Sequence, residues 1–467
     1  MPAVSQHVAA LLAAAAIALL PAPTAAKGGA YPRSAHGKRD TGVMRVPGLA
    51  RGECGHCHGA PRDALGRKVD EGRGHAQLFS PNDNALCVRC HVAPASSWLG
   101  ESRYAASAHG SAPGMVWPGP APRGRAAGDE GKCVNCHDPH GVMDRAGLVP
   151  SLLRLRGSAL CFGCHSGGPA PDVASAFTKT YRHPLLPDPG AVTSPAAWGL
   201  GDAVAVPTEA ATCSSCHNPH AAAARTSALG SSEGPGALLG TSRVRVSNGP
   251  RGTPPLRSRL KAGDPNTVRE FEVCFKCHAS GTDRATARVD VAVALNPANA
   301  SFHPVEARGR NRAIDRRSFA TGWGPDRLVS CSDCHSSDDG LARGPHGSSF
   351  PHLLVRRYAA ETEDRQPYET DLCFGCHAFR TYGDRLGGAD AAFSRFSGHA
   401  SHLAKPSGYS CWACHDAHGS TTLPALLAYR TPGITDYREN LDGTRTCTAT
   451  CHGPKNPDRF YRPQYPR

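Results

Sequence analysis

The sequence predicts a chain of mostly irregular coil with short α-helices and little β-sheet, wrapped around covalently bound groups rather than around an apolar core of its own. Three observations support this prediction. Glycine and proline supply 51 and 40 of the 467 residues, and aromatic residues make up only 6%. Such a composition buries too little apolar surface to offset the conformational entropy of the chain. The third observation is a set of twenty cysteines, all of which stand in closely spaced pairs.

Every cysteine pair is followed directly by a histidine. Nine pairs have the spacing C-x-x-C-H, and the last has C-x-x-x-C-H. C-x-x-C-H is the attachment motif of c-type haem, in which two thiols bond the porphyrin and the histidine binds the iron from one side. Cysteines three positions apart lie on one face of a helical turn, so each motif is expected to form a single turn. The sequence therefore predicts ten covalently attached haems c, stacked to form the core.

The predicted haem-binding residues fall into two sets. The thioether bonds are expected at Cys54, Cys57, Cys87, Cys90, Cys133, Cys136, Cys161, Cys164, Cys213, Cys216, Cys274, Cys277, Cys331, Cys334, Cys373, Cys376, Cys411, Cys414, Cys447 and Cys451. The proximal iron ligands are expected to be His58, His91, His137, His165, His217, His278, His335, His377, His415 and His452.

Two other interpretations of paired cysteines fit less well. A zinc ribbon needs two such pairs without the trailing histidine, and a dithiol redox motif stands near a βαβ pattern, which this sequence does not show. The longer spacing between Cys447 and Cys451 leaves open the interpretation that this motif binds no haem.

The ten motifs form five pairs, with further residues repeated around them. A histidine precedes each pair. In four pairs a histidine in a string such as Pro-His-Gly, and then a Leu-Leu dipeptide expected to pack on haem, separate the two motifs. We therefore expect a signal peptide at 1–26, followed by dihaem units at 27–100, 101–178, 179–297 with a surface-loop insertion, 298–395, and 396–467 with a Pro/Tyr/Arg-rich tail.

The second axial ligand of each iron is also expected to be histidine, because only three methionines follow the signal peptide. Each unit offers one upstream and one intervening histidine. An intervening histidine three residues after a proximal one cannot easily reach the opposite face of the same haem, so we expect it to bind a neighbouring haem. His352 is interpreted as spare. The distal candidates are His36, His75, His109, His140, His183, His220, His303, His346, one of His399 and His402, and His418.

This layout resembles the multihaem c-type cytochromes built from doubled C-x-x-C-H units. The resemblance covers nearly the whole chain after the signal peptide, and it implies relatives that act as periplasmic shuttles, porin-inserted conduits, surface reductases or cytochrome filaments. The expected partners are redox proteins: a quinol-linked or cytochrome-linked donor, and a downstream acceptor or an outer-membrane conduit.

The apolar run from Val8 to Leu20, with small residues after it, predicts export to the periplasm or the cell surface. It is too short to span a bilayer, and no later run of 18 apolar residues exists, so no transmembrane segment is expected. The net charge of +13 is spread along the chain and is expected to balance haem propionates. Nucleic-acid binding is therefore not expected.

Iron with histidine on both sides has no vacant position, so the predicted function is electron transfer rather than catalysis. Two alternatives remain. One is a multihaem oxidoreductase acting on nitrite, hydroxylamine or a sulfur oxyanion at one open haem. The first unit, at His58 or His91, is the best place for it, because this unit lacks the Pro-His-Gly string. The other is a filament subunit, which would make the chain a homo-polymer.

Overall fold

The computed structural model describes most of the chain after the expected signal peptide. The described residues are 29–58, 78–80, 84–91, 101–119, 131–185, 211–226, 233–260, 268–279, 290–311, 313–358, 368–384, 389–403, 409–430, 433–442, 444–452 and 458–461. The expected signal peptide and His75 lie outside them. The chain forms two compact units: Met1–Leu86 with Cys133–Arg156, and Cys87–Lys132 with Gly157–Arg467.

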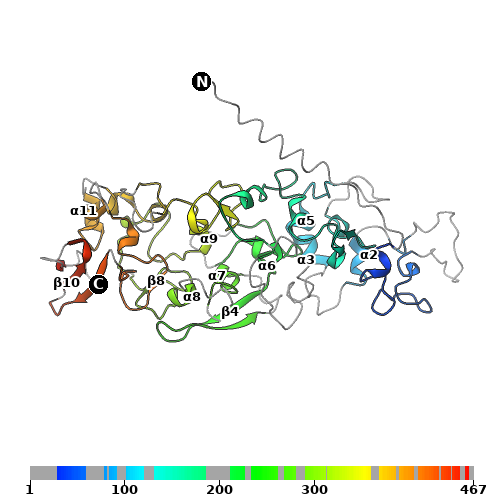
Figure 1. Cartoon of the computed structure of the whole chain (residues 1–467), viewed down its shortest axis with the longest axis horizontal. Coiled ribbons are helices and arrows are strands. Elements are labelled where there is room, and N and C mark those ends of the chain that lie inside the picture. The colour runs from blue at the N-terminus through cyan, green and yellow to red at the C-terminus, as the bar shows by residue number, and fades with distance from the viewer. Residues whose placement is uncertain are drawn as a thin grey trace, which may run out of the picture. The chain divides into compact units, whose positions relative to one another are not determined.

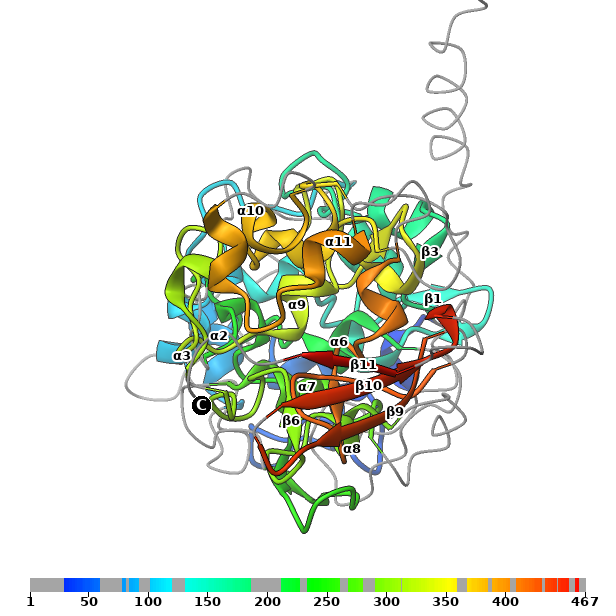
Figure 2. The ribbon, with the colours of Figure 1, turned by 90° about the vertical axis from the view of Figure 1, so that its left-hand side faces the viewer.

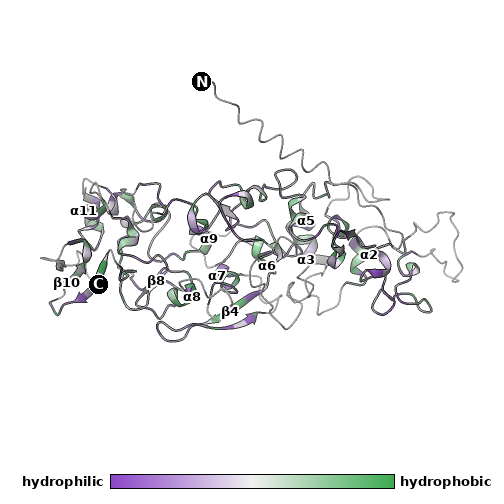
Figure 3. Cartoon of the chain, in the orientation of Figure 1, coloured by the Kyte–Doolittle hydropathy of each residue, from purple (hydrophilic) through white to green (hydrophobic). Residues whose placement is uncertain are grey.

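Short helices in a large amount of coil make up both units (Figure 1), as the sequence predicts. The α-helices are α2 (Asn84–Val88), α3 (Glu101–Ala106), α4 (Ala108–Ser111), α5 (Ser158–Phe162), α6 (Cys213–Cys216), α7 (Glu270–Cys274), α8 (Val291–Ala294), α9 (Cys331–Cys334), α10 (Phe379–Tyr382) and α11 (His399–Leu403). Hydrophobic and hydrophilic residues alternate over short distances along these elements (Figure 3). In the described part of the chain, no helix is long and apolar enough to cross a membrane.

Strands are short, and they pair either with a nearby strand or with a strand of the next sequence repeat within the same compact unit. They are β1 (Met143–Asp144), β2 (Gly147–Leu148), β3 (Tyr181–Arg182), β4 (Arg243–Ser247), β5 (Leu256–Leu260), β6 (Ser301–Phe302), β7 (Gly347–Ser348), β8 (Gly419–Ser420), β9 (Ile434–Glu439), β10 (Arg445–Ala449) and β11 (Asp458–Tyr461). The largest sheet has the order β11-β10-β9 and is antiparallel (Figure 2). It lies at the end of the chain, where the tail adds β11 to the edge of β10.

The predicted single turn forms in all nine C-x-x-C-H motifs. In each of them the backbone N–H of the histidine donates to the carbonyl of the first cysteine, with N···O distances of 2.8–3.1 Å. Capping boxes begin two of these turns, at Thr212 before α6 and at Ser330 before α9, and they satisfy backbone N–H groups that such short helices leave without partners. The tenth motif differs, because Cys447 lies in β10 and Cys451 lies in a separate 3₁₀ turn, η15 (Thr450–His452).

Consecutive repeats interlock through two small ladders. β3 precedes His183 and pairs with β7, which follows His346; β6 precedes His303 and pairs with β8, which follows His418. Glycine is required in both ladders, because a Cβ at Gly347 or Gly419 would lie 1.8 or 2.1 Å from a backbone carbonyl oxygen. The glycine of the His-Gly dipeptide is therefore needed for close backbone packing as well as for the turn.

Apolar side chains gather in small clusters rather than in one core, as expected. One cluster contains Phe271, Phe275 and Leu295, and Val244 and Val246 of β4 pack against it. The β4–β5 hairpin, in the stretch expected to be a surface insertion, thus contributes to this cluster; β4 lies near α7 and α8 in Figure 1. Another cluster, around Leu427 and Tyr437, packs against motif cysteines.

Candidate functional site

Among the described residues, eight pairs of imidazole rings face one another at nearly the same separation. Each pair joins one proximal histidine to one histidine expected to be distal. The distances between ring centroids are 6.0 Å for His58/His140, 6.1 Å for His165/His109, 6.0 Å for His217/His346, 6.1 Å for His278/His183, 6.2 Å for His335/His418, 6.5 Å for His377/His303, 6.1 Å for His415/His399 and 5.9 Å for His452/His402.

This separation fits an iron between two imidazoles. Metal–nitrogen bonds of about 2.0 Å on each side, added to the half-width of each ring, require centroids roughly 6.4 Å apart. Direct ring stacking would bring the rings closer together. The pairing also brings both His399 and His402 opposite a proximal histidine, although the sequence predicts only one of them as a ligand.

The pairs follow a simple order along the chain. The second-motif histidine of a unit faces the upstream histidine of the same unit, as His278 faces His183. The first-motif histidine faces the intervening histidine of the next unit, as His335 faces His418. The last unit has no unit after it, and its first-motif histidine, His415, faces the upstream His399 instead.

Hydrogen bonds at Nδ1 determine the tautomer of many of these rings. The Nδ1 atom lies within hydrogen-bonding distance of a backbone carbonyl oxygen in His36, His109, His137, His217, His303, His335, His346, His399, His402 and His415. A carbonyl can only accept, so Nδ1 carries the proton and Nε2 keeps its lone pair. This is the tautomer that binds a metal through Nε2.

Burial keeps these imidazoles neutral. It lowers the pKa of His399 to about 3 and the pKa values of His346, His377 and His418 to about 4. Neutral imidazole is the metal-binding form. In contrast, the hydrogen bond to Asp138 raises the pKa of His140.

Asx turns fix the intervening histidines, and sequence reasoning missed this role. The side-chain oxygens of Asp138, Asn218 and Asp416 each accept from the backbone N–H of the histidine two residues later, at 2.9–3.0 Å. Asp and Asn readily form such turns. The signal was present in the sequence as an Asp or Asn between the proximal and the intervening histidine.

The Leu-Leu dipeptides lie in a strained turn beside the first motif. We call residues 150–153, 351–354 and 424–427 the Leu-Leu turns. Their two central residues have left-handed backbones, with φ of 55° and 57° at Ser151 and Leu152, 60° and 59° at His352 and Leu353, and 54° and 58° at Ala425 and Leu426. No other non-glycine residue in the described ranges has positive φ. Left-handed conformation costs an L-residue about 1–2 kcal/mol.

Motif cysteines from consecutive units meet. The thiols of Cys161 and Cys213, of Cys274 and Cys331, and of Cys373 and Cys411 lie within hydrogen-bonding reach of each other. In each case the second motif of one unit meets the first motif of the next. If each thiol bonds a porphyrin, these contacts bring the edges of successive haems together.

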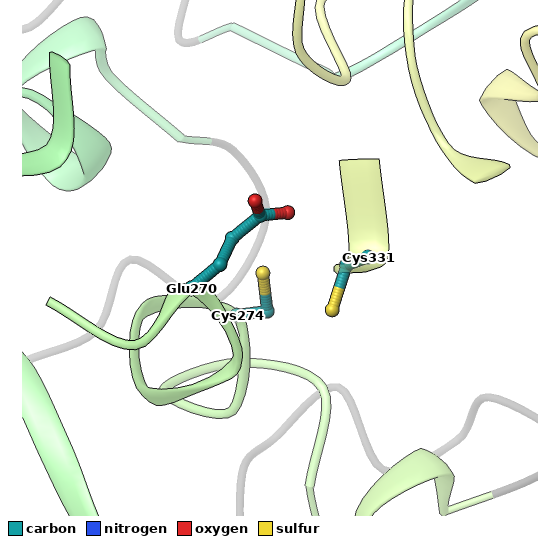
Figure 4. Close-up of side chains that lie close together, drawn as sticks. All are labelled: Glu270, Cys274 and Cys331. Atoms are coloured by element: carbon teal, nitrogen blue, oxygen red, sulfur yellow. The ribbon is translucent and has the colours of Figure 1, made fainter. Parts of the chain in front are cut away.

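One such junction has the composition of a metal site. The sulfur atoms of Cys274 and Cys331 and a carboxylate oxygen of Glu270 lie within 4.8 Å of one another (Figure 4). However, both oxygens of Glu270 already accept hydrogen bonds from Ser332, one from its backbone N–H at 2.7 Å and one from its Oγ at 2.8 Å. Glu270 therefore anchors the turn of the next motif, and the cluster is a junction between motifs.

The remaining histidines have other positions. His56 is fully buried, and its Nδ1 accepts from the backbone N–H groups of Arg45 and Val46, so it has a structural role. The side chain of His352, interpreted as spare, faces no proximal ring in these pairs, but its carbonyl accepts from His335 Nδ1 at 2.8 Å.

Two family models match parts of the chain. Residues 126–170 match the doubled CXXCH motif. Residues 260–426 match outer membrane cytochrome MtrC/MtrF-like, domains II/IV. No curated protein and no solved structure matches the chain. Both models describe sequence features of multihaem c-type cytochromes. The chain therefore has the features of an electron-transfer cytochrome that binds c-type haem covalently.

Proposed function

We propose that this chain is an exported decahaem c-type cytochrome that carries electrons along a series of bis-histidine haems. The eight facing histidine pairs are the observation that supports this best, because their spacing and tautomers suit an iron between them. Haem c supplies a one-electron iron couple when it is bound. If an imidazole bound the iron on each side, no position would remain for a substrate, which would favour electron transfer over bond chemistry.

His36 and His220 are the distal ligands that we propose for the two remaining haems. His36 Nδ1 contacts the carbonyl of Pro139 at 3.2 Å, as His109 Nδ1 contacts that of Pro219 at 3.1 Å. The ring of His220 lies 6.1 Å from Tyr104, as the ring of His140 lies 6.0 Å from Tyr31. Each therefore repeats the surroundings of a histidine that faces a proximal ring. His75 becomes spare under this proposal.

The chain holds its motifs in an order suited to conduction. Thiol junctions join the second motif of one unit to the first motif of the next. Facing histidines join the first motifs of successive units, as with His335 and His418. The thiol junctions link the second unit to the third, the third to the fourth and the fourth to the fifth, and facing histidines link the first unit to the second. Under this proposal, electrons pass along the chain without a mobile carrier.

The family model over residues 260–426 carries the description of outer membrane cytochromes. We therefore propose a place at the outer surface or in the extracellular space, with periplasmic location as the alternative. The partners would be a cytochrome or conduit that delivers electrons and an acceptor outside the cell. Cell fractionation with haem staining tests this location, and haem confined to the soluble periplasmic fraction would contradict it.

The mass of the purified native protein tests the haem count. We expect ten haems per chain. A mass corresponding to nine would contradict this count, and the Cys447/Cys451 motif, whose spacing is longer, would be the first candidate for the empty one. Electron paramagnetic resonance (EPR) of the oxidised protein tests the ligation. Low-spin ferric signals alone are expected, whereas a substantial high-spin signal would favour an oxidoreductase with an open haem. Electron microscopy of the same sample distinguishes single particles from filaments.

A further inference from the structure

The Leu-Leu turns place a carbonyl against the proximal histidine of the first motif. In each turn the first left-handed residue supplies it. The oxygens of Ser151, His352 and Ala425 accept from Nδ1 of the proximal histidine at 2.9, 2.8 and 2.9 Å. The proximal residues are His137, His335 and His415. One local geometry thus recurs in three units, although the residue that supplies the carbonyl differs in each.

Further backbone hydrogen bonds attach the turn to the motif. The residue after each turn donates to the carbonyl of the second motif cysteine: Val355 to Cys334 and Ala428 to Cys414, both at 2.9 Å. The carbonyl of Leu426 also accepts from the residue after the proximal histidine, Asp416, at 2.8 Å. The turn is therefore fixed to the backbone on both sides of the imidazole. Its left-handed residues aim the intervening carbonyl at Nδ1.

The ring planes of the eight pairs separate according to motif. Pairs that contain a first-motif histidine have angles of 13°, 27°, 1° and 21° between their ring planes. Pairs that contain a second-motif histidine have angles of 66°, 72°, 41° and 75°. A hydrogen bond from Nδ1 restrains rotation of an imidazole about its bond to iron. Two of these first-motif rings, those of His335 and His415, bond to a Leu-Leu turn, and their planes lie 1° and 21° from those of their partners. The ring of His217 bonds instead to the carbonyl of Ala237 at 3.0 Å.

We propose that the Leu-Leu turn is a positioning element that holds the proximal imidazoles of His137, His335 and His415 and sets the redox potential of the haems that they would bind. This inference rests on the proposed bis-histidine ligation. Donation from Nδ1–H to a carbonyl raises the basicity of the ligating Nε2. A more basic ligand stabilises ferric over ferrous iron and makes the potential more negative. The backbone strain then has a function, as strained residues at functional sites commonly do.

Substitutions at His352 separate the backbone from the side chain. His352→Val places a β-branched residue where left-handed conformation is strongly disfavoured. His352→Gly and His352→Asn also remove the imidazole, but they tolerate that conformation. We expect one haem of the His352→Val protein to shift to a more positive potential in a spectroelectrochemical titration, with an altered low-spin EPR signal for the same haem. The Gly and Asn variants should keep both properties of the wild type.

A second position keeps the test decisive if one of these variants fails to fold. Ala425→Val and Ala425→Gly make the same comparison in the last unit. Equal potentials in the Val and Gly variants at both sites would overturn the inference. So would a shift that follows loss of the His352 imidazole in all three variants at that position. Failure of the proposed ligation is distinguishable, because it would give a high-spin signal in the wild-type protein itself.

Discussion

The imidazole planes of His335 and His418 are 1° apart, and their centroids are separated by 6.2 Å. The two residues belong to different repeats of the sequence, and each is positioned by a separate hydrogen bond. The backbone carbonyl oxygen of His352 accepts a hydrogen bond from Nδ1–H of His335, with an N···O distance of 2.8 Å. Asp416 accepts from the backbone N–H of His418 at 3.0 Å. The proposed iron site is therefore built by two units jointly.

Loss of His418 should open a single haem. We expect His418→Gly to give a high-spin ferric EPR signal from one haem per chain, and carbon monoxide binding to the reduced protein at one site. The matched control is His352→Asn, which removes a nearby histidine that faces no proximal ring and should leave the protein low-spin. A His418→Gly protein that stayed fully low-spin would show that another side chain serves this iron.

Lys276 should raise the potentials of the haems of the third unit. It lies inside the motif that begins at Cys274, and its ammonium donates to the carbonyl of Ser215 in the unit's other motif and to Ser242 Oγ at 3.1 Å. Burial lowers the pKa of Lys276. A nearby positive charge disfavours ferric iron by on the order of 1 kcal/mol.

Lys276→Met should therefore shift one or two haems to more negative potentials by tens of millivolts in a redox titration. Lys38→Met removes an exposed lysine and serves as the control. An unchanged titration curve for Lys276→Met would contradict an electrostatic role for Lys276.

Glu306 should make the stability of the protein depend on pH. Burial raises its pKa from 4.5 to about 7. One carboxylate oxygen accepts from Asn248 Nδ2 at 2.6 Å, and the other is buried without a hydrogen-bond partner among the described residues. The native state therefore binds more protons than the unfolded state between these two pKa values. The free energy of unfolding should consequently fall as pH rises through this interval.

Glu306→Gln should remove that loss. Guanidinium unfolding at pH 5 and pH 8 measures this loss. The free energy of unfolding of the variant should be similar to that of the wild type at pH 5 and higher than that of the wild type at pH 8. Glu369→Gln, at an exposed position, provides the control. The prediction fails if the midpoints of wild type and Glu306→Gln change in parallel with pH.

The chain should not fold without haem attachment. Its apolar clusters are small, and several of them pack directly against motif cysteines. Protein made in cells that lack the cytochrome c maturation machinery should show little helical signal in circular dichroism and rapid proteolysis. A compact, protease-resistant apoprotein would mean that the polypeptide supplies its own core.

The sequence predicts the motif turns well because C-x-x-C-H fixes a local geometry that nine motifs share. It also predicts that an intervening histidine binds a neighbouring haem, from the short distance between His415 and His418, but it does not predict that this neighbour belongs to the preceding unit. It does not predict the left-handed Leu-Leu turns, since Ser151, His352 and Ala425 share no property that favours positive φ. Helix α11 places His399 and His402 opposite two different proximal rings. Counting one upstream histidine per repeat could not predict this.

If the chain is exported as we propose, the interlocking of its repeats determines the order in which it is assembled. A first-motif histidine such as His217 meets its facing ring, His346, only after the following unit has emerged. Under the proposed ligation, each such iron would wait with five ligands while the next part of the chain crosses the membrane. Folding would then proceed from the N-terminus to the C-terminus. A chain truncated between two units would keep one iron site that lacks its second axial ligand.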